Sequence, residues 1–119
     1  MKVYADGGCL QNGTSDAHGY GSFVVEGQEL FRLDFGMGVT NNQCEYRALI
    51  AALEYAKEIG FNPDVFMDSA LVVNQVAGRW NINVAALRPL CAKASQLMRE
   101  TGASLTWVKR DVLVEKLGH

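Results

Sequence analysis

The order of its secondary-structure patterns is the feature that most limits how this chain can fold. Strand patterns come first, over residues 2–6, 19–29 and 30–35, and a turn at Glu26-Gly27 joins the second of them to the third. After residue 40, helical patterns alternate with short strand patterns until the end of the chain. This order predicts an α/β fold with a mixed sheet that begins with antiparallel strands and carries helices on its faces.

The boundaries of the later elements follow from cap, turn and glycine signals. Thr40-Asn41-Asn42 can cap a first long helix, whose apolar positions recur at three- and four-residue intervals until Gly60. A short buried strand over residues 64–67 then leads through Asp68-Ser69 into a second helix, which runs through Val76. The remaining predicted elements are a third helix from Leu87 until Gly102, a strand over residues 104–109 and a final short helix.

Composition limits the class of protein. At 119 residues, with 49% hydrophobic and 20% charged residues, the chain is expected to form one domain over residues 1–119. No run of about 18 apolar residues is present, so no membrane contact is expected. The formal net charge of −2 argues against tight nonspecific binding to nucleic acid, because phosphate contacts usually come from clustered Lys and Arg. Three cysteines at wide spacing match neither a disulfide framework nor a paired zinc site, so we expect a reducing, cytoplasmic location. We also expect a monomer, because the sequence gives no sign of an obligatory protein partner.

Three carboxylates come from distant segments that the predicted fold can bring together. The first strand is expected to end at Gly7-Gly8, so Asp6 lies at a strand end, Asp68 lies at another, and Glu45 lies in the first turns of a helix. Carboxylates crowded at one point repel one another unless divalent cations compensate, and two such cations suit an in-line phosphoryl displacement. Taken singly, acids at such positions more often act as caps or lie in solvent.

The residues around these three acids favour a functional role over capping or exposure to solvent. Tyr4-Ala5-Asp6-Gly7-Gly8-Cys9 with Asn12, the block TNNQCEYRAL from Thr40 to Leu49, and Met67-Asp68-Ser69 with Val72 resemble the three signature blocks of the small type 1 ribonuclease H family. The blocks occur in family order over nearly the whole chain. The resemblance implies a ribonuclease H-like fold, in which a five-stranded mixed sheet, three antiparallel strands followed by two parallel ones, is flanked by helices.

The same resemblance implies a metal-dependent endoribonuclease that hydrolyses the RNA strand of RNA–DNA hybrids and leaves 5′-phosphate ends. Asp6, Glu45 and Asp68 would bind two Mg²⁺ ions, with Mn²⁺ as an alternative. The minor groove of a hybrid exposes 2′-hydroxyl groups, which distinguish RNA from DNA. The residues that resemble the family's substrate contacts are Gly7, Gly8, Cys9, Asn12, Asn41, Asn42, Gln43 and Ser69. Contacts with the DNA strand are expected from Ser69, Asn74, Arg79 and Trp80.

The chain departs from the family pattern near its C-terminal end. The family places a fourth Asp at the start of its last helix, after a segment that Trp107-Val108-Lys109-Arg110 resembles. In this chain Glu115 takes that place across a shorter loop and is the fourth candidate for a catalytic and metal-binding carboxylate, with Asp111 as the alternative. A longer Glu side chain could reach further across the shortened loop, at the cost of more rotamer freedom.

Two histidines are assigned no chemical role, and two tryptophans could stack on sugars or bases but more often pack in the core at such positions. The family's flexible loop often holds a His, but none lies between Trp107 and Glu115, and neither His18 nor His119 is expected to be catalytic. Trp80 and Trp107 are expected mainly to pack in the core.

Two other functions stay open at this level. The chain could be a binding module that kept the groove for the hybrid and lost its chemistry through the altered fourth acid. It could also be another nuclease of the same fold, such as a junction resolvase or a domain of a reverse transcriptase. Three intact carboxylates favour the enzyme, and the TNN loop followed by Glu45 favours the hybrid-specific branch.

Overall fold

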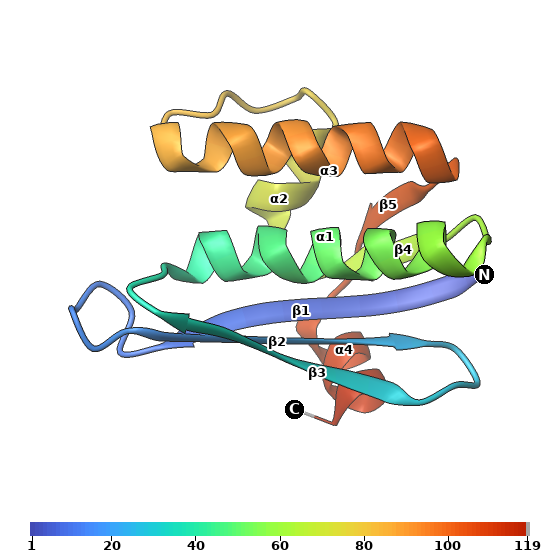
Figure 1. Ribbon diagram of the computed structural model, residues 1–119, viewed down its shortest axis with the longest axis horizontal. Helices are drawn as coiled ribbons and strands as arrows, with labels where there is room; N and C mark the ends of the chain where they lie inside the picture. Colours follow the sequence, from blue (N-terminus) through green and yellow to red (C-terminus); the bar gives the residue numbers. More distant parts are fainter. Residues whose placement is uncertain (119) are drawn as a thin grey trace.

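Five strands form one mixed sheet in the computed structural model, which describes residues 1–118 (Figure 1). In chain order they are β1 (Lys2–Leu10), β2 (His18–Val25), β3 (Leu30–Met37), β4 (Asp64–Met67) and β5 (Ser104–Trp107). Their order across the sheet is β3-β2-β1-β4-β5. β2 is antiparallel to both β1 and β3, whereas β4 is parallel to both β1 and β5. The predicted sheet, three antiparallel strands followed by two parallel ones, is confirmed.

Within residues 1–118, helices follow the third, fourth and fifth strands, whereas the first three strands are joined by loops and turns. The helices are α1 (Asn41–Ile59), α2 (Ala70–Val76), the 3₁₀ turn η1 (Ala85–Leu87), α3 (Arg88–Thr101) and α4 (Arg110–Leu117). α1 begins where its sequence predicts, because Thr40 Oγ1 accepts from Gln43 N while the Gln43 side chain accepts from Thr40 N. It ends at Gly60, which adopts the left-handed conformation that favours glycine. Within residues 1–118, every helix is too short or too polar to cross a membrane.

Two strand boundaries differ from the prediction. β1 does not end at Gly7-Gly8 but continues to Leu10, because both glycines pair with β2. Asp6 therefore lies in the middle of β1 rather than at its end. Glycine adopts extended backbone as well as turns, so the Gly-Gly pair alone did not distinguish the two. β5 ends at Trp107 instead of Lys109, because β4, its neighbour in the sheet, ends at Met67.

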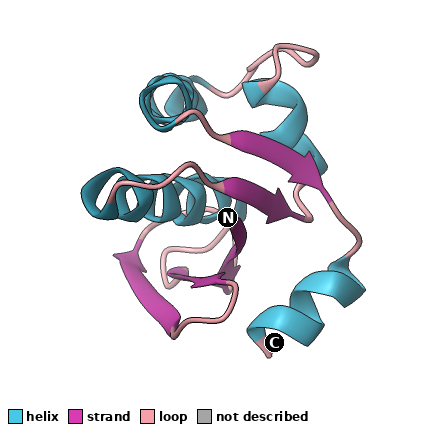
Figure 2. Ribbon diagram, turned by 90° about the vertical axis from the view of Figure 1, so that its right-hand side faces the viewer, coloured by secondary structure: helices cyan, strands magenta, loops and turns pink. Residues whose placement is uncertain are grey.

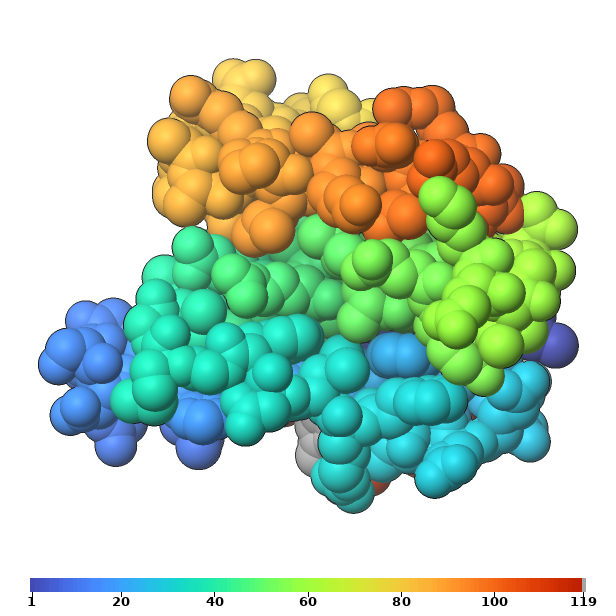
Figure 3. Space-filling view, in the orientation of Figure 1, coloured from blue at the N-terminus to red at the C-terminus, as the bar shows by residue number. Residues whose placement is uncertain are grey.

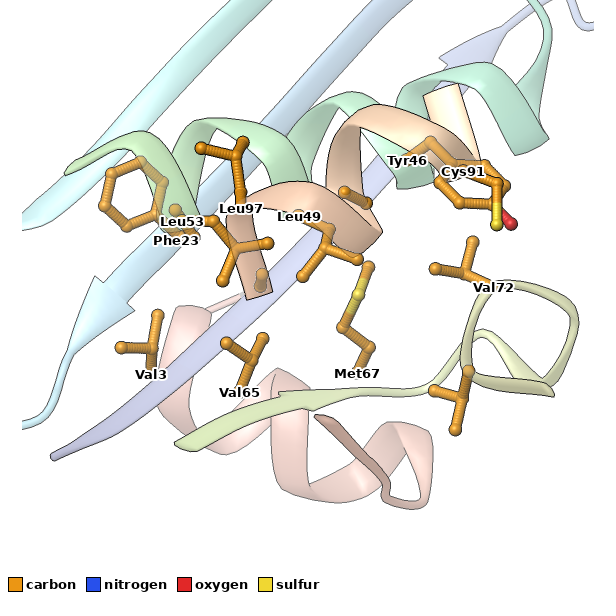
Figure 4. Close-up of a cluster of buried hydrophobic side chains, with 14 of the residues drawn as sticks. Val3, Phe23, Tyr46, Leu49, Leu53, Val65, Met67, Val72, Cys91 and Leu97 are labelled. Atoms are coloured by element: carbon orange, nitrogen blue, oxygen red, sulfur yellow. The ribbon is translucent and has the colours of Figure 1, made fainter. Parts of the chain in front are cut away.

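The main core lies between one face of the sheet and α1, with α2 and α3 packed beside it. Figure 4 shows side chains from β1, β2 and β4 facing those of the helices. Tyr46 lies inside this core, and its hydroxyl donates to Gln75 Oε1 at 2.7 Å, so the polar atom is satisfied. The buried residues labelled there are Val3, Phe23, Tyr46, Leu49, Leu53, Val65, Met67, Val72, Cys91 and Leu97.

A smaller core lies on the opposite face of the sheet. Figure 2 shows α4 on the side of the sheet away from α1 and α3. Leu113 and Leu117 of α4 pack on Tyr4 of β1 in this second core. Because α4 has 8 residues and α1 has 19, α4 covers a smaller part of its face.

Candidate active site

Asp6 lies on β1, and Asp68 lies just beyond the end of the neighbouring parallel strand β4. The register of β1 and β4 pairs Tyr4 with Phe66, and the same register continued by two residues aligns Asp6 with Asp68. β4 has ended by then, so Asp68 follows the end of its strand, as predicted, while β1 runs on through Asp6. Both side chains are largely shielded, with exposed fractions of 8% for Asp6 and 16% for Asp68. Two acids from distant segments therefore lie side by side.

The guanidinium of Arg110, at the start of α4, contacts both of these carboxylates. Arg110 Nη1 is 3.2 Å from Asp68 Oδ2 and 4.0 Å from Asp6 Oδ2. The shorter contact is a charge-assisted hydrogen bond, and the longer one is a looser ion pair. Arg110 is 63% exposed, so solvent screens part of the attraction. Sequence patterns did not single out Arg110; its place in the segment that resembles the family, just before the last helix, was the one available signal.

Glu45 joins this cluster from α1. Burial raises the pKa of its carboxyl, and the negative charges of Asp68 and Asp6 raise it further. A hydrogen bond from Ser69 and the positive charge of Arg110 lower the pKa. Glu45 therefore lies in the same region as Asp6 and Asp68, where the charges of the three carboxylates act on one another.

Hydrogen bonds fix the backbone and the cap beside Asp68. Ser69 Oγ accepts from Val72 N at 3.2 Å, which caps α2, and the same side chain hydrogen-bonds Glu45. Trp107 Nε1 donates to the carbonyl oxygen of Asp68 at 3.0 Å. Trp107 is therefore a neighbour of the site that sequence reasoning missed.

Both tryptophans depart from the prediction that they pack mainly in the core. Trp107 is 48% exposed, because it ends β5, which is an edge strand of the sheet. Trp80 is 49% exposed, because it lies in the irregular segment between α2 and η1.

The donor set suits a hard divalent cation, although its present arrangement does not enclose one. Carboxylate oxygens are the ligands that Mg²⁺ prefers, and Asp6, Glu45 and Asp68 supply them. Within residues 1–118, no three His, Cys, Asp or Glu side chains lie close enough together to hold an ion. Arg110 supplies part of the positive charge instead. The oxygen donors of these residues therefore suit the predicted ions, and the Arg110 guanidinium lies beside two of the candidate ligands.

Glu115 lies further along α4, near Tyr4. Burial raises the pKa of Tyr4, and its hydrogen bond to Glu26 and the charges of Glu26 and Glu115 add to that rise. After burial, the groups that act most strongly on the pKa of Glu45 are Ser69, Asp68, Asp6 and Arg110. Asp111 is exposed in the first turn of α4. The identity of the fourth acid stays a prediction.

The predicted contacts with the minor groove gather where the β1–β2 loop meets the start of α1. Asn12 Oδ1 accepts from Asn41 N at 3.0 Å, and Cys9 Sγ donates to Val39 O at 3.1 Å. Figure 3 shows this loop projecting beside the start of α1. The predicted contacts at this junction are Cys9, Asn12, Asn41, Asn42 and Gln43. Their approach to a substrate stays a prediction, as the fold shows only that they lie together.

Gly7 and Gly8 are both buried, and other groups of the protein occupy the space that a side chain would need at either position. A Cβ at Gly7 would overlap the backbone carbonyl of Cys44 in α1. A Cβ at Gly8 would lie 2.5 Å from Tyr20 Oη, on the opposite face of the sheet. Internal packing thus accounts for glycine at these positions, and contact with a ribose stays a prediction.

Of the side chains expected beside the DNA strand, Ser69 caps the start of α2, whereas the other three lie around its end. Asn74 Oδ1 accepts from Arg79 Nε at 2.8 Å, while Asn74 Nδ2 donates to Ala70 O at 2.7 Å. Arg79 and Trp80 are exposed just beyond this helix. Their exposure permits the predicted contacts, which nothing in the fold tests.

Known proteins match most of this chain in sequence. A family model described as reverse transcriptase-like matches residues 12–114. Ribonuclease HI of Halobacterium salinarum is 37% identical over 105 residues, which are 82% of this chain and 50% of that protein. The bifunctional protein Rv2228c of Mycobacterium tuberculosis is 37% identical over 118 residues, which are 92% of this chain and 32% of that protein. The chain therefore spans half of the first relative and about a third of the second.

Solved structures share its fold. RNase H1 of Halobacterium salinarum superposes with a TM-score of 0.76 at 32% identity, covering 95% of this chain and 89% of that one. LC11-RNase H1, solved in complex with an RNA/DNA hybrid, gives a TM-score of 0.79 at 27% identity and covers 96% of this chain and 88% of that one. Sequence blocks, strand order and relatives agree, and the chain belongs to the ribonuclease H family, in its small type 1 group.

Proposed function

We propose that this chain hydrolyses the RNA strand of RNA–DNA hybrids with the help of two Mg²⁺ ions, for which Mn²⁺ can substitute. The observation that carries the proposal is the convergence of Asp6, Glu45 and Asp68 from three distant segments. The complex of the related LC11-RNase H1 with an RNA/DNA hybrid supports the same substrate class for this chain.

The chain's own residues have distinct parts in the proposed reaction. When bound, the metal ions would supply an activated water and stabilise the leaving oxygen. Asp6 of β1 and Asp68, which follows β4, would hold these ions beside the scissile phosphate. Glu45 contributes charge only when it has lost its proton, and the hydrogen bond from Ser69 favours that charged form. Hydrolysis would leave 5′-phosphate and 3′-hydroxyl ends.

Selectivity for RNA would come from the junction of the β1–β2 loop with α1. Its amide side chains can donate to and accept from a 2′-hydroxyl, and a DNA strand in the same place would leave those groups unpaired. The hydrogen bond from Asn41 N to Asn12 Oδ1 joins the loop to the helix, so part of this surface is arranged before substrate binds.

A cleavage assay tests the proposal. The purified protein is incubated with labelled RNA–DNA hybrid, duplex DNA and duplex RNA, each with Mg²⁺, with Mn²⁺ or with a chelator. We expect cleavage of the hybrid alone, and only with a divalent ion. Asp6→Asn should lower the rate by more than about 100-fold, because removing even an outer partner of a metal ligand costs about 10- to 100-fold.

The matched control is Asp64→Asn, at the other, exposed end of β4, and this variant should cleave like the wild type. Full activity of Asp6→Asn would contradict the proposed site. Cleavage of duplex DNA would point instead to another nuclease of the same fold.

The fourth acid is tested by a pair of variants. We expect Glu115→Gln to lower the cleavage rate far more than Asp111→Asn, because the resemblance to the family pattern puts Glu115 in the place of the missing Asp. The reverse order would assign the role to Asp111, which lies in the first turn of α4.

A second candidate function is binding of the hybrid without cleavage. One observation favours it: Arg110 contacts both Asp6 and Asp68 and so supplies part of the charge that a metal ion would bring. Binding of the hybrid without cleavage under either ion would establish this function in place of hydrolysis.

A further inference from the structure

A row of polar side chains crosses the sheet beside the carboxylates. Strand pairing aligns Asp6 of β1 with Ser22 of β2, and Ser22 with Arg32 of β3. Directly opposed residues in a sheet project to the same face, so these three side chains share the face on which α4 packs. α4 packs on Tyr4, two residues before Asp6 on the same strand. Arg110, the first residue of α4, forms an ion pair with Asp6 of the polar row.

A hollow of about 450 Å³ opens at this row. The hydroxyl of Tyr20 lies over Gly8, two residues along β1 from Asp6, and so forms one wall on the same face. Two guanidinium groups and two hydroxyl-bearing side chains line one cavity. The complete lining is Tyr20, Gly21, Ser22, Arg32, Leu33 and Arg110.

The lining is basic, although the chain as a whole has a formal net charge of −2. Among the described residues that line the hollow, none is acidic. Within residues 1–118, Arg32 makes no ion pair or side-chain hydrogen bond, whereas Arg110 pairs with Asp68. A guanidinium that has no partner among residues 1–118, and that extends from a sheet strand beside a second guanidinium, suits bidentate binding of an oxyanion such as phosphate.

We propose that this hollow binds a backbone phosphate of the nucleic acid, next to the phosphate that is cleaved. The inference rests on the proposed function and adds a substrate-binding site to it. The contacts predicted for the minor groove lie at the β1–β2 loop and the start of α1. The hollow lies on the α4 side of Asp6, so it supplies an anchor separate from those contacts, with Arg32 as its principal residue.

Salt-dependent binding of the hybrid tests this site. The affinity of the wild-type chain for labelled RNA–DNA hybrid is measured in a chelator, which prevents cleavage, at several salt concentrations. Arg32→Gln should weaken binding about tenfold and reduce the slope of log K against log salt by about one, as loss of one phosphate contact does. Arg32→Lys should recover the slope but only part of the affinity, because Lys keeps the charge and loses the planar fork.

The matched control is Arg99→Gln, an exposed arginine in the last turn of α3 and outside the hollow, which should change neither affinity nor slope. Wild-type affinity and slope in Arg32→Gln would overturn the proposal. A titration with inorganic phosphate, monitored by the NMR chemical shifts of β2 and β3, tests whether a free anion is the ligand. Shifts at Arg32 with unchanged binding of the hybrid would overturn the assignment to nucleic acid.

The two proposals fail in different ways. If the wild type cleaves the hybrid and Arg32→Gln binds it normally, the hydrolysis stands and the hollow is rejected. If binding depends on Arg32 and no hybrid is cleaved with either metal ion, the hollow stands and the hydrolysis is rejected.

Discussion

The two faces of the sheet differ in how completely helices cover them. On one face, α1 with 19 residues and α3 with 14 close a core whose central side chains are inaccessible to solvent. On the other face, α4 has 8 residues and buries a cluster centred on Tyr4, Leu113 and Leu117. The acids Asp6 and Asp68, with Arg110, lie beyond the edge of this smaller cluster.

This difference indicates that one face of the sheet mainly stabilises the fold, whereas the other accommodates the polar site. Burial of apolar surface supplies most of the free energy of folding, so the closed face holds the chain together. Polar groups need water, a hydrogen bond or a ligand, and an incompletely covered face leaves room for them. The short α4 thus positions Arg110 without closing the site.

The largest expected effect distinguishes the two cores. Leu49→Ala, in the closed core, should lower the free energy of unfolding by about 2–5 kcal/mol, because the packed surroundings cannot collapse into the cavity. Leu113→Ala, under α4, should cost less than about 2 kcal/mol, because the smaller cluster can rearrange. Urea unfolding measures both values. We further expect Leu113→Ala to speed hydrogen exchange in α4 alone. Equal losses of unfolding free energy in the two variants would mean that both faces contribute equally to stability.

A smaller effect compares adjacent glycines that face opposite ways. Gly7→Ala should cost about 1–3 kcal/mol or more, because its Cβ would overlap backbone in α1 that cannot move alone. Gly8→Ala should cost less than about 1 kcal/mol, because its Cβ meets only the far end of the Tyr20 side chain, which can turn into solvent. Thermal unfolding compares the variants. A larger cost at Gly8 would show that the open face is as rigid as the closed one.

Two helix caps give a still smaller effect. Ser69→Ala and Thr40→Ala should each cost about 1 kcal/mol, because each removes a side-chain acceptor for a backbone N–H in the first turn. Ser69→Ala should also raise the pKa of Glu45 further, because it removes a hydrogen bond that favours the charged carboxylate. NMR titration of Glu45 in both variants checks this. A matching rise in Thr40→Ala would contradict the role given to Ser69.

The last prediction concerns pH, and only its direction is expected. Burial, and then the charges of Asp68 and Asp6, raise the pKa of Glu45 above its ordinary value of 4.5. The folded state therefore holds the proton more tightly than the unfolded state. The resulting stability is present below pH 4.5 and is lost as pH rises through the folded pKa.

Glu45→Gln carries no such charge, so the stability of this variant relative to the wild type should increase as pH rises. Urea unfolding in a chelator at about pH 4 and about pH 7 measures the difference. Glu54→Gln, an exposed Glu on the same helix, is the matched control and should show a smaller change with pH. A stability difference for Glu45→Gln that is constant with pH would contradict the assigned cause.

Much of the fold followed from local signals. The bounds of α1 were predicted from the Thr40 cap and Gly60, because a helix begins and ends where neighbouring residues satisfy its free backbone groups. The end of β1 was predicted wrongly at Gly7-Gly8, because the extent of a strand depends on its partner, and β2 pairs as far as Leu10. Trp107 was placed in the core for a similar reason: its residue type gave no sign that β5 would be an edge strand.

The sequence by itself determined the order of elements, the family, and three acids at Asp6, Glu45 and Asp68 as candidate ligands. Only the tertiary structure decided that Arg110 contacts two of those acids and that Arg32 lines a hollow beside them. The physical reason is that periodicity and caps act over a few neighbouring residues. A contact between Arg110 and Asp6 instead depends on how α4 packs across the sheet, which no local pattern encodes.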